Sequence, residues 1–269
     1  MLTAYMDESY SDGNVMCVGG WLCDEKKWAT IESQWQKRID YENRQSAKRG
    51  LPPITRYHAT DLNNYRNEFK GWDERRAVLF TKKLIDILGR GKEPIMKPIG
   101  IACGVRVPHL VGNFPQDHPT IYKNHFAAYR LCMIENLLVL SRTLATAFPD
   151  EKVAVIYDKG PFGGAAQSAF ESFQESKVKR YEDVLTMAPV DGKKCIALQC
   201  ADLFAYEGRK LVTNPKQAER EFRRSLRRVI GNDNYLRVRQ ITKDVLEKIA
   251  ANRKSAPEPP HDWDPSSGV

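Results

Sequence analysis

Three aspartates lie in surroundings where a carboxylate can do chemistry. Asp7 follows the apolar run LTAYM, Asp158 follows KVAVIY, and Asp202 lies within the apolar segment CIALQCADLFAY. Placing a carboxylate in apolar surroundings costs free energy, because its hydration is lost, unless it is paired or binds a metal ion. If the strands ending at Asp7 and Asp158 are neighbours, both side chains project at one sheet edge, where ligands of open α/β sheets tend to bind. A divalent cation would relieve the repulsion among converging carboxylates, and two such ions about 3.5–4 Å apart can activate water against a phosphodiester.

The sequence alone leaves other roles open for the same acids. An aspartate after a strand is often a helix cap or a turn residue, which is the alternative for Asp158. Asp202 could instead pair with Arg209 or Lys210. Glu8 would point to the opposite face from its neighbour if the strand continued, so it would reach the same site only if the strand bends there.

The elements that must position these acids follow from apolar periodicity. The runs Thr3–Asp7 and Asn14–Cys23 flank a turn and predict an antiparallel hairpin. Further strands are predicted over Ile99–Val107, Lys152–Tyr157 and Asp183–Pro189, with a loop over Pro108–Pro119. Helices are predicted over Asp24–Ala47, Asp73–Leu88, Ile121–Ala147, Ala165–Ser176, Cys195–Leu211 (continuing to about Val229) and Val238–Ala251.

This order of elements predicts an α/β fold. A hairpin followed by strands that alternate with helices favours a mixed sheet over an all-parallel one. We expect a single domain over residues 1–254 with basic helices at its C-terminal end. The tail, residues 255–269, has four prolines and no core pattern, so we expect it to be disordered.

Composition argues against a membrane-spanning, secreted or zinc-binding protein. The chain has 269 residues, 42% of them hydrophobic, and no apolar run of the roughly 18 residues that a membrane span needs. The N-terminus lacks the basic start and apolar run of a signal peptide, so we expect a cytoplasmic protein. The six cysteines form no CxxC pair, which predicts reduced, mostly buried thiols and no zinc site.

Positive charge is concentrated in one segment. The chain carries a net charge of +8, and residues 209–239 hold ten basic and three acidic residues, a net +7. Such a concentration is the electrostatic signature of a polyanion partner, although a solvated helix face is the alternative. Arginine predominates, and its guanidinium group matches phosphate oxygens. We expect the nucleic-acid backbone to be held by Arg220, Arg223, Arg224, Arg227 and Arg228, with Lys159 beside the scissile phosphate.

Two short motifs resemble a known family. Asp7-Glu8-Ser9 lies near the N-terminus, and His58 lies further along the chain. Leu198–Tyr206 reads LQCADLFAY, which contains a Q-x-A-D-L motif. This order resembles the bacterial and phage family called domain of unknown function 3800, over about Leu2 to Leu211. The resemblance implies an RNase H-like fold, with a mixed sheet flanked by helices, and a metal-dependent nuclease. It also implies one metal-binding aspartate on the first strand, one on a later strand and one on a late helix.

Asp7, Asp158 and Asp202 match those three places. Two positions depart from the family pattern: Tyr10 stands where the family has glycine or a small residue, and Arg56 where an acid is common.

We therefore expect a nuclease that uses Mg2+ or Mn2+ to hydrolyse DNA or RNA. Asp7, Asp158 and Asp202 are the expected metal ligands, and Glu8 an auxiliary ligand. Gln199 and His58 are expected to act around the metals, His58 by moving a proton. Two alternatives are a protein of the same fold that binds nucleic acid or another protein without catalysis, and a phosphohydrolase of small phosphoesters.

Overall fold

The computed structural model describes residues 1–11, 14–89, 98–113, 121–176, 178, 180–214 and 236–254. The expected arginine contacts at 220–228 and the tail 255–269 lie outside these ranges, so their predictions are not tested by the structure. All six cysteines are free thiols and all but Cys195 are buried, as the sequence predicts. Within the described ranges, no helix has the length and apolar character needed to cross a bilayer.

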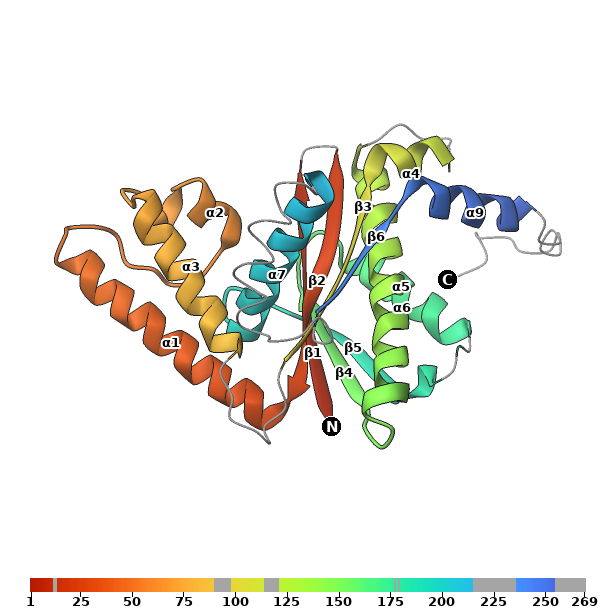
Figure 1. Cartoon of the computed structure of the whole chain (residues 1–269), viewed down its shortest axis with the longest axis horizontal. Helices are drawn as coiled ribbons and strands as arrows, with labels where there is room; N and C mark the ends of the chain where they lie inside the picture. Colours follow the sequence, from red (N-terminus) through yellow and green to blue (C-terminus); the bar gives the residue numbers. More distant parts are fainter. Residues whose placement is uncertain are drawn as a thin grey trace, which may run out of the picture.

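One six-stranded mixed sheet organises the chain (Figure 1), which confirms the predicted α/β class. Its hairpin, β1 and β2, is antiparallel, and β2 is antiparallel to β3. The pairs β1–β4, β4–β5 and β3–β6 are parallel. The strands run in the order β5 (Val184–Val190), β4 (Val153–Asp158), β1 (Leu2–Ser11), β2 (Val15–Asp24), β3 (Ile99–Arg106) and β6 (Leu236–Ile241).

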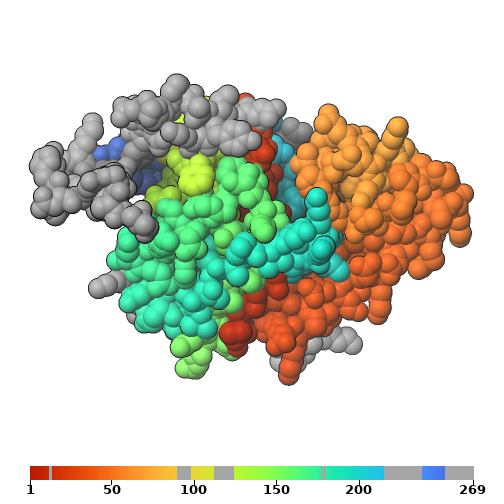
Figure 2. Space-filling view, turned by 180° about the vertical axis from the view of Figure 1, so that it is seen from behind, coloured from red at the N-terminus to blue at the C-terminus, as the bar shows by residue number. Residues whose placement is uncertain are grey.

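Helices cover both faces of this sheet (Figure 1). One face carries α7 (Ile196–Thr213), beyond which lie α1 (Glu25–Ala47), α2 (Ala59–Asn63) and α3 (Glu74–Gly89). Seen from behind, α1 and α3 form the orange lobe beside the body of the molecule (Figure 2). The other face carries α5 (Ile121–Ala147) and α6 (Gly163–Glu175), with α4 (Val107–Asn113) and α9 (Lys243–Lys254) packed together.

Strand β1 sends alternate side chains to these two layers, as an extended strand must. Leu2, Ala4 and Met6 are buried in the apolar core beneath α5 and α6. Tyr5 faces the aromatic core beneath α7, α1 and α3. By the same alternation Asp7 belongs to the α7 side, and Glu8 to the α5 side.

Small residues allow α7 to lie close against the sheet. A Cβ atom added to Gly19 of β2 would lie 3.3 Å from the Cα of Ala205, and one added to Gly208 would lie 2.9 Å from the Sγ of Cys17. The side chain of Trp21 also donates a hydrogen bond to the carbonyl of Cys200 (3.0 Å). This close approach places the Gln199–Asp202 turn of α7 beside β1.

Most predicted elements are confirmed. Helix α1 follows Asp24, whose side chain caps it by accepting a hydrogen bond from the Lys27 N–H (2.8 Å). The predicted starts of two elements are wrong. The start of the helix predicted at Val238 belongs to strand β6, because the sequence LRVRQI alternates with the period of a strand. The start of the loop predicted at Pro108 is helix α4, which accommodates a proline in its first turn, where the missing N–H costs no hydrogen bond.

Helix α7 ends at Thr213, and its C-cap residue Asn214 is not helical (φ −141°, ψ 82°). The predicted unbroken continuation of this helix to about Val229 is therefore wrong at Asn214, and residues 215–229 lie outside the described ranges.

Candidate active site

The site forms where β1 extends beyond its neighbour β4. The two strands pair from Leu2↔Val153 to Met6↔Tyr157, and Asp158 is the last residue of β4. Strand β1 continues to Ser11, paired with β2 alone. The expectation that the first strand ends at Asp7 is therefore wrong. Beyond the end of β4, one side of β1 is open to side chains from both faces of the sheet.

Three carboxylates meet at this open edge. Asp7, Glu8 and Asp158 each offer an oxygen, and these oxygens all lie within 4.8 Å of one another. Glu8 reaches the cluster although β1 continues in register past it, paired with Val18. Glu8 therefore reaches the site without the bend in β1 that the sequence-based expectation required. Because β4 ends at Asp158, no β4 backbone lies beside Glu8 to separate the two faces of the sheet.

Backbone groups and glycines shape this acidic cluster. The Gly192 N–H donates to Asp158 Oδ1 (2.7 Å), and the Glu8 N–H donates to Asp7 Oδ1 (2.8 Å). A Cβ atom at Gly192 would lie 2.6 Å from the same Asp158 oxygen, and one at Gly160 would lie 2.9 Å from Glu8 Oε1. Both glycines therefore leave room for the carboxylates.

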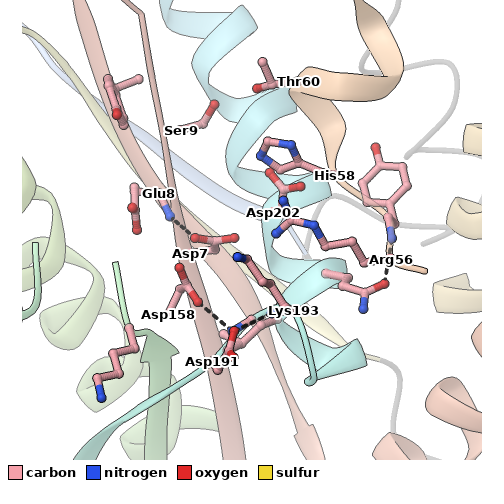
Figure 3. A pocket seen from close by; sticks show the side chains of 16 residues that line it. Asp7, Glu8, Ser9, Arg56, His58, Thr60, Asp158, Asp191, Lys193 and Asp202 are labelled. Carbon is pink, nitrogen blue, oxygen red and sulfur yellow. Dashed lines mark hydrogen bonds between the residues drawn. The ribbon is translucent and has the colours of Figure 1, made fainter. Parts of the chain in front are cut away.

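The cluster opens into a cleft of about 570 Å³ (Figure 3). Polar and charged side chains dominate its wall, so it suits a charged ligand. It is lined by Asp7, Glu8, Ser9, Tyr10, Arg56, Tyr57, His58, Thr60, Asp158, Lys159, Asp191, Gly192, Lys193, Leu198, Gln199 and Asp202.

Helix α7 supplies the opposite wall and holds a loop in place. Asp202 Oδ2 accepts a hydrogen bond from the Ala59 N–H (2.7 Å), and Gln199 Oε1 accepts one from the Tyr57 N–H (2.9 Å). These bonds fix the segment that carries His58. Asp202 lines the cleft but is not among the three carboxylates grouped within 4.8 Å.

The basic residues further along α7 contact other groups. Arg209 donates to Ser9 Oγ (3.0 Å), and Lys210 forms an ion pair with Glu207 (2.9 Å). Asp202 instead accepts its hydrogen bond from the backbone of the His58 segment. The alternative in which Asp202 serves only to pair with one of these bases is therefore not favoured.

His58 is oriented by a neighbouring acid. Its Nδ1 lies 2.8 Å from Asp61 Oδ2, one turn further along. Burial alone would raise the pKa of Asp61, but hydrogen bonds from His58 and Asn67 hold that pKa below its ordinary value. A histidine held at Nδ1 in this way presents its other ring nitrogen for proton transfer. His58 lines the cleft, so the geometry is compatible with its predicted role.

Three acids of the cleft, Asp7, Glu8 and Asp202, resist ionisation. Burial and the neighbouring Glu8, Asp202 and Asp158 raise the pKa of Asp7 well above its ordinary value. Burial and Asp158 raise the pKa of Glu8 to about 7. Burial raises the pKa of Asp202 to about 6, against the opposing effects of His58, the Ala59 N–H and Arg56. A bound cation would reverse this balance by favouring the ionised forms.

These shifts predict how stability depends on pH when no divalent cation is bound. A carboxyl group whose pKa is raised by folding binds more protons in the folded state, so its stabilising effect is complete below its unfolded pKa of about 4 and is lost as pH rises. With EDTA present, Tm should therefore fall between pH 5 and pH 8 relative to Glu8→Gln, because Glu8 ionises near pH 7. Saturating Mg2+ should remove most of that difference.

Differential scanning fluorimetry on both proteins, with EDTA and with Mg2+, measures this effect. The comparison with Glu8→Gln cancels the titrations of groups that Glu8 does not affect, and reports the ionisation of Glu8 together with its effect on Asp7. A wild-type protein that gains stability relative to Glu8→Gln as pH rises in EDTA would contradict the assignment of a crowded acidic cluster.

Several cleft residues were not predicted as functional from sequence. Asp191, Gly192 and Lys193 follow β5, which is parallel to β4, so they reach the same sheet edge as Asp158. Their place directly after a predicted strand could have indicated this, since the carboxyl ends of parallel strands lie at the same edge of a sheet. Tyr10, one of the two departures from the family pattern, also lines the cleft.

Three basic residues line the cleft together with the acids. Lys159 follows Asp158 directly, and its N–H donates to the Val190 carbonyl (2.8 Å), which fixes the backbone at the cleft. Arg56 and Lys193 lie on the α7 side, as Figure 3 shows for their side chains. Lys159 lines the same cleft as the carboxylates, whereas its predicted place beside the scissile phosphate stays a prediction.

Fold and site together define an α/β protein with an acidic cleft at the carboxyl ends of the parallel strands β4 and β5. No protein-family model matches this chain, and no curated protein matches it in sequence. The resemblance to domain of unknown function 3800 therefore stays a prediction.

Proposed function

We propose that this protein is a metal-dependent nuclease that hydrolyses phosphodiester bonds with Mg2+ or Mn2+. The observation that carries the proposal is the approach of the Asp7, Glu8 and Asp158 oxygens to within 4.8 Å of one another in a polar cleft. Carboxylate oxygens are the ligands that both cations prefer. Without a bound cation, burial and the repulsion among these carboxylates raise the pKa values of Asp7 and Glu8.

These residues have distinct roles in the proposed reaction. Asp7, Glu8 and Asp158 would hold the cation, with Asp202 on α7 facing them as the further acid. When bound, the cation supplies charge stabilisation for a phosphodiester and lowers the pKa of water. Arg56, Lys159 and Lys193 hold the phosphate by charge-assisted hydrogen bonds. His58, oriented by Asp61, moves a proton.

The RNase H-like assignment belongs to the same proposal. The first strand carries Asp7, the parallel strand beside it ends at Asp158, and the late helix α7 carries Asp202. That sequence of elements is the one the family resemblance implies for the three metal-binding aspartates. The support is the placement of the acids on these elements, not similarity to any particular protein.

The proposal predicts cation-dependent cleavage of a polynucleotide. We expect Mg2+ or Mn2+ to bind with micromolar to millimolar affinity by isothermal titration calorimetry, and to start hydrolysis of labelled oligonucleotides that EDTA stops. Single-stranded and duplex DNA, RNA and RNA–DNA hybrids of one sequence should be compared, beside a small phosphodiester. Binding of nucleic acid with no cleavage by any cation would favour the non-catalytic alternative. Cleavage of the small ester alone would favour the phosphohydrolase alternative.

A further inference from the structure

Tyr10 is exposed at the rim of the cleft. It lies two residues after Glu8 on β1, so both side chains leave the strand on the same face. Its side chain lines the cleft together with Glu8 and Lys159. Of this residue, 49% is exposed, although aromatic side chains contact its ring.

A stack of aromatic residues supports the Tyr10 ring from below. Phe162 meets it edge-to-face at 5.6 Å between centroids, and His125 lies tilted against it at 5.7 Å. Phe162 is itself stacked on the buried Tyr129 (5.1 Å, 11° between the rings). Phe162 and Tyr129 are buried in the core, so the Tyr10 ring packs against a fixed neighbour while about half of the residue faces solvent.

The rest of the cleft explains what such a ring would contact. Lys159, Arg56 and Lys193 offer charge for phosphate groups, and the carboxylates offer a place for a cation. Among the described residues of the lining, Leu198 is the only aliphatic one, and the other tyrosine, Tyr57, is 3% exposed, so the wall provides little other apolar surface for a nucleobase. A nucleobase is the part of a nucleic acid that gains most from an exposed aromatic ring, since base–aromatic stacking needs no particular sequence.

We propose that Tyr10 is a stacking platform for one unpaired base of the substrate strand, beside the scissile phosphate. This inference rests on the proposed nuclease function and specifies its substrate class: single-stranded or locally unpaired nucleic acid. In an intact duplex both faces of each internal base are covered by neighbouring bases, so the Tyr10 ring would have no free face to stack on. The partner is thus an unstacked nucleotide whose phosphate lies near Lys159.

The test uses the full chain with a ring-removing and a ring-keeping variant. Tyr10→Leu removes the ring, Tyr10→Phe keeps it, and Tyr41→Leu removes an equally exposed tyrosine (44%) outside the cleft. Binding is measured in EDTA by fluorescence anisotropy with a single-stranded oligonucleotide and a blunt duplex of the same sequence. Cleavage of both is then measured with Mg2+ or Mn2+. Tm values verify that each variant is folded.

The expected result is a selective loss. Tyr10→Leu should weaken single-strand binding by about 5- to 150-fold, the range for loss of one stacked base, and leave duplex binding within about twofold. Tyr10→Phe and Tyr41→Leu should bind like wild type. A single-stranded oligonucleotide with 2-aminopurine should show fluorescence quenching that Tyr10→Leu abolishes.

Failure of this inference is distinguishable from failure of the proposed function. Metal-dependent cleavage that is unchanged in Tyr10→Leu on both substrates, with unchanged binding, would overturn the stacking role alone. Ring-dependent binding without cleavage by any cation would overturn the nuclease function alone. A wild-type protein that binds neither oligonucleotide overturns both, and a Tyr10→Leu variant that loses single-strand and duplex binding equally overturns the stacking role.

Discussion

Replacing Asp7 with Asn should abolish hydrolysis while leaving the protein folded. Asp7 is one of the three clustered carboxylates, and its pKa is raised by burial and by Glu8, Asp202 and Asp158. Loss of a cation ligand removes several kcal/mol of transition-state stabilisation, so kcat should fall by about 10³-fold or more. Stability in EDTA should hold or rise, because an isosteric neutral side chain relieves like-charge repulsion.

Hydrolysis and Tm are measured on one preparation, with and without Mg2+. The stabilisation that Mg2+ gives to wild type should be lost in Asp7→Asn, and nucleic-acid binding in EDTA should hold or tighten, because one negative charge facing phosphate is removed. Asp86→Asn is the matched control, since Asp86 lies on α3 near Lys83 and outside the cleft. A destabilised Asp7→Asn that cleaves at the wild-type rate per folded molecule would remove Asp7 from the site, and with it most of the nuclease proposal.

The sequence predicted the sheet well where the pattern was simple. The hairpin, the strand ending at Asp158 and the helices α1, α3, α5, α6 and α7 all follow from apolar periodicity. It failed at β6, because a short alternating run next to a helix was read with the wrong period. It also failed at α4, where histidine and proline residues suggested a loop although a proline fits the first turn of a helix.

The sequence identified the aspartates of the site, but not the arrangement of the strands and loops around them. Asp7, Asp158 and Asp202 stood out because carboxylates are costly in apolar segments. The contribution of Glu8 depends on β4 ending one residue after the last pair with β1, and no local pattern encodes that difference in strand length. The support of the His58 loop by Gln199 and Asp202 is a contact between residues about 140 positions apart. Such long-range contacts follow from how α7 packs on the sheet, rather than from any one segment.

The contacts of Asp202 support two different roles. Its Oδ2 is engaged by the Ala59 N–H, yet it lines the cleft and its charge helps to raise the pKa of Asp7. It can therefore be an anchor for the His58 loop, a cation ligand through its remaining oxygen, or both. Asn at this position keeps an oxygen that can accept from the Ala59 N–H, and removes only the negative charge.

We expect Asp202→Asn to lower kcat by about 10²-fold or more while Tm holds or rises, because the buried carboxyl group already resists ionisation and its charge is needed only for the cation. Asp202→Ala should lose both activity and stability, since it leaves the Ala59 N–H without its acceptor, a cost of about 1–3 kcal/mol for a buried donor. Gln199→Ala, which removes the parallel bond to Tyr57, controls for loop support without a change in charge. If Asp202 only anchors the loop, Asp202→Asn should instead match wild type in kcat, and Asp202→Ala should resemble Gln199→Ala. Comparing kcat, KM and Tm across the three variants assigns the role, because only a carboxylate that serves the cation makes the isosteric amide inactive in a fully folded protein.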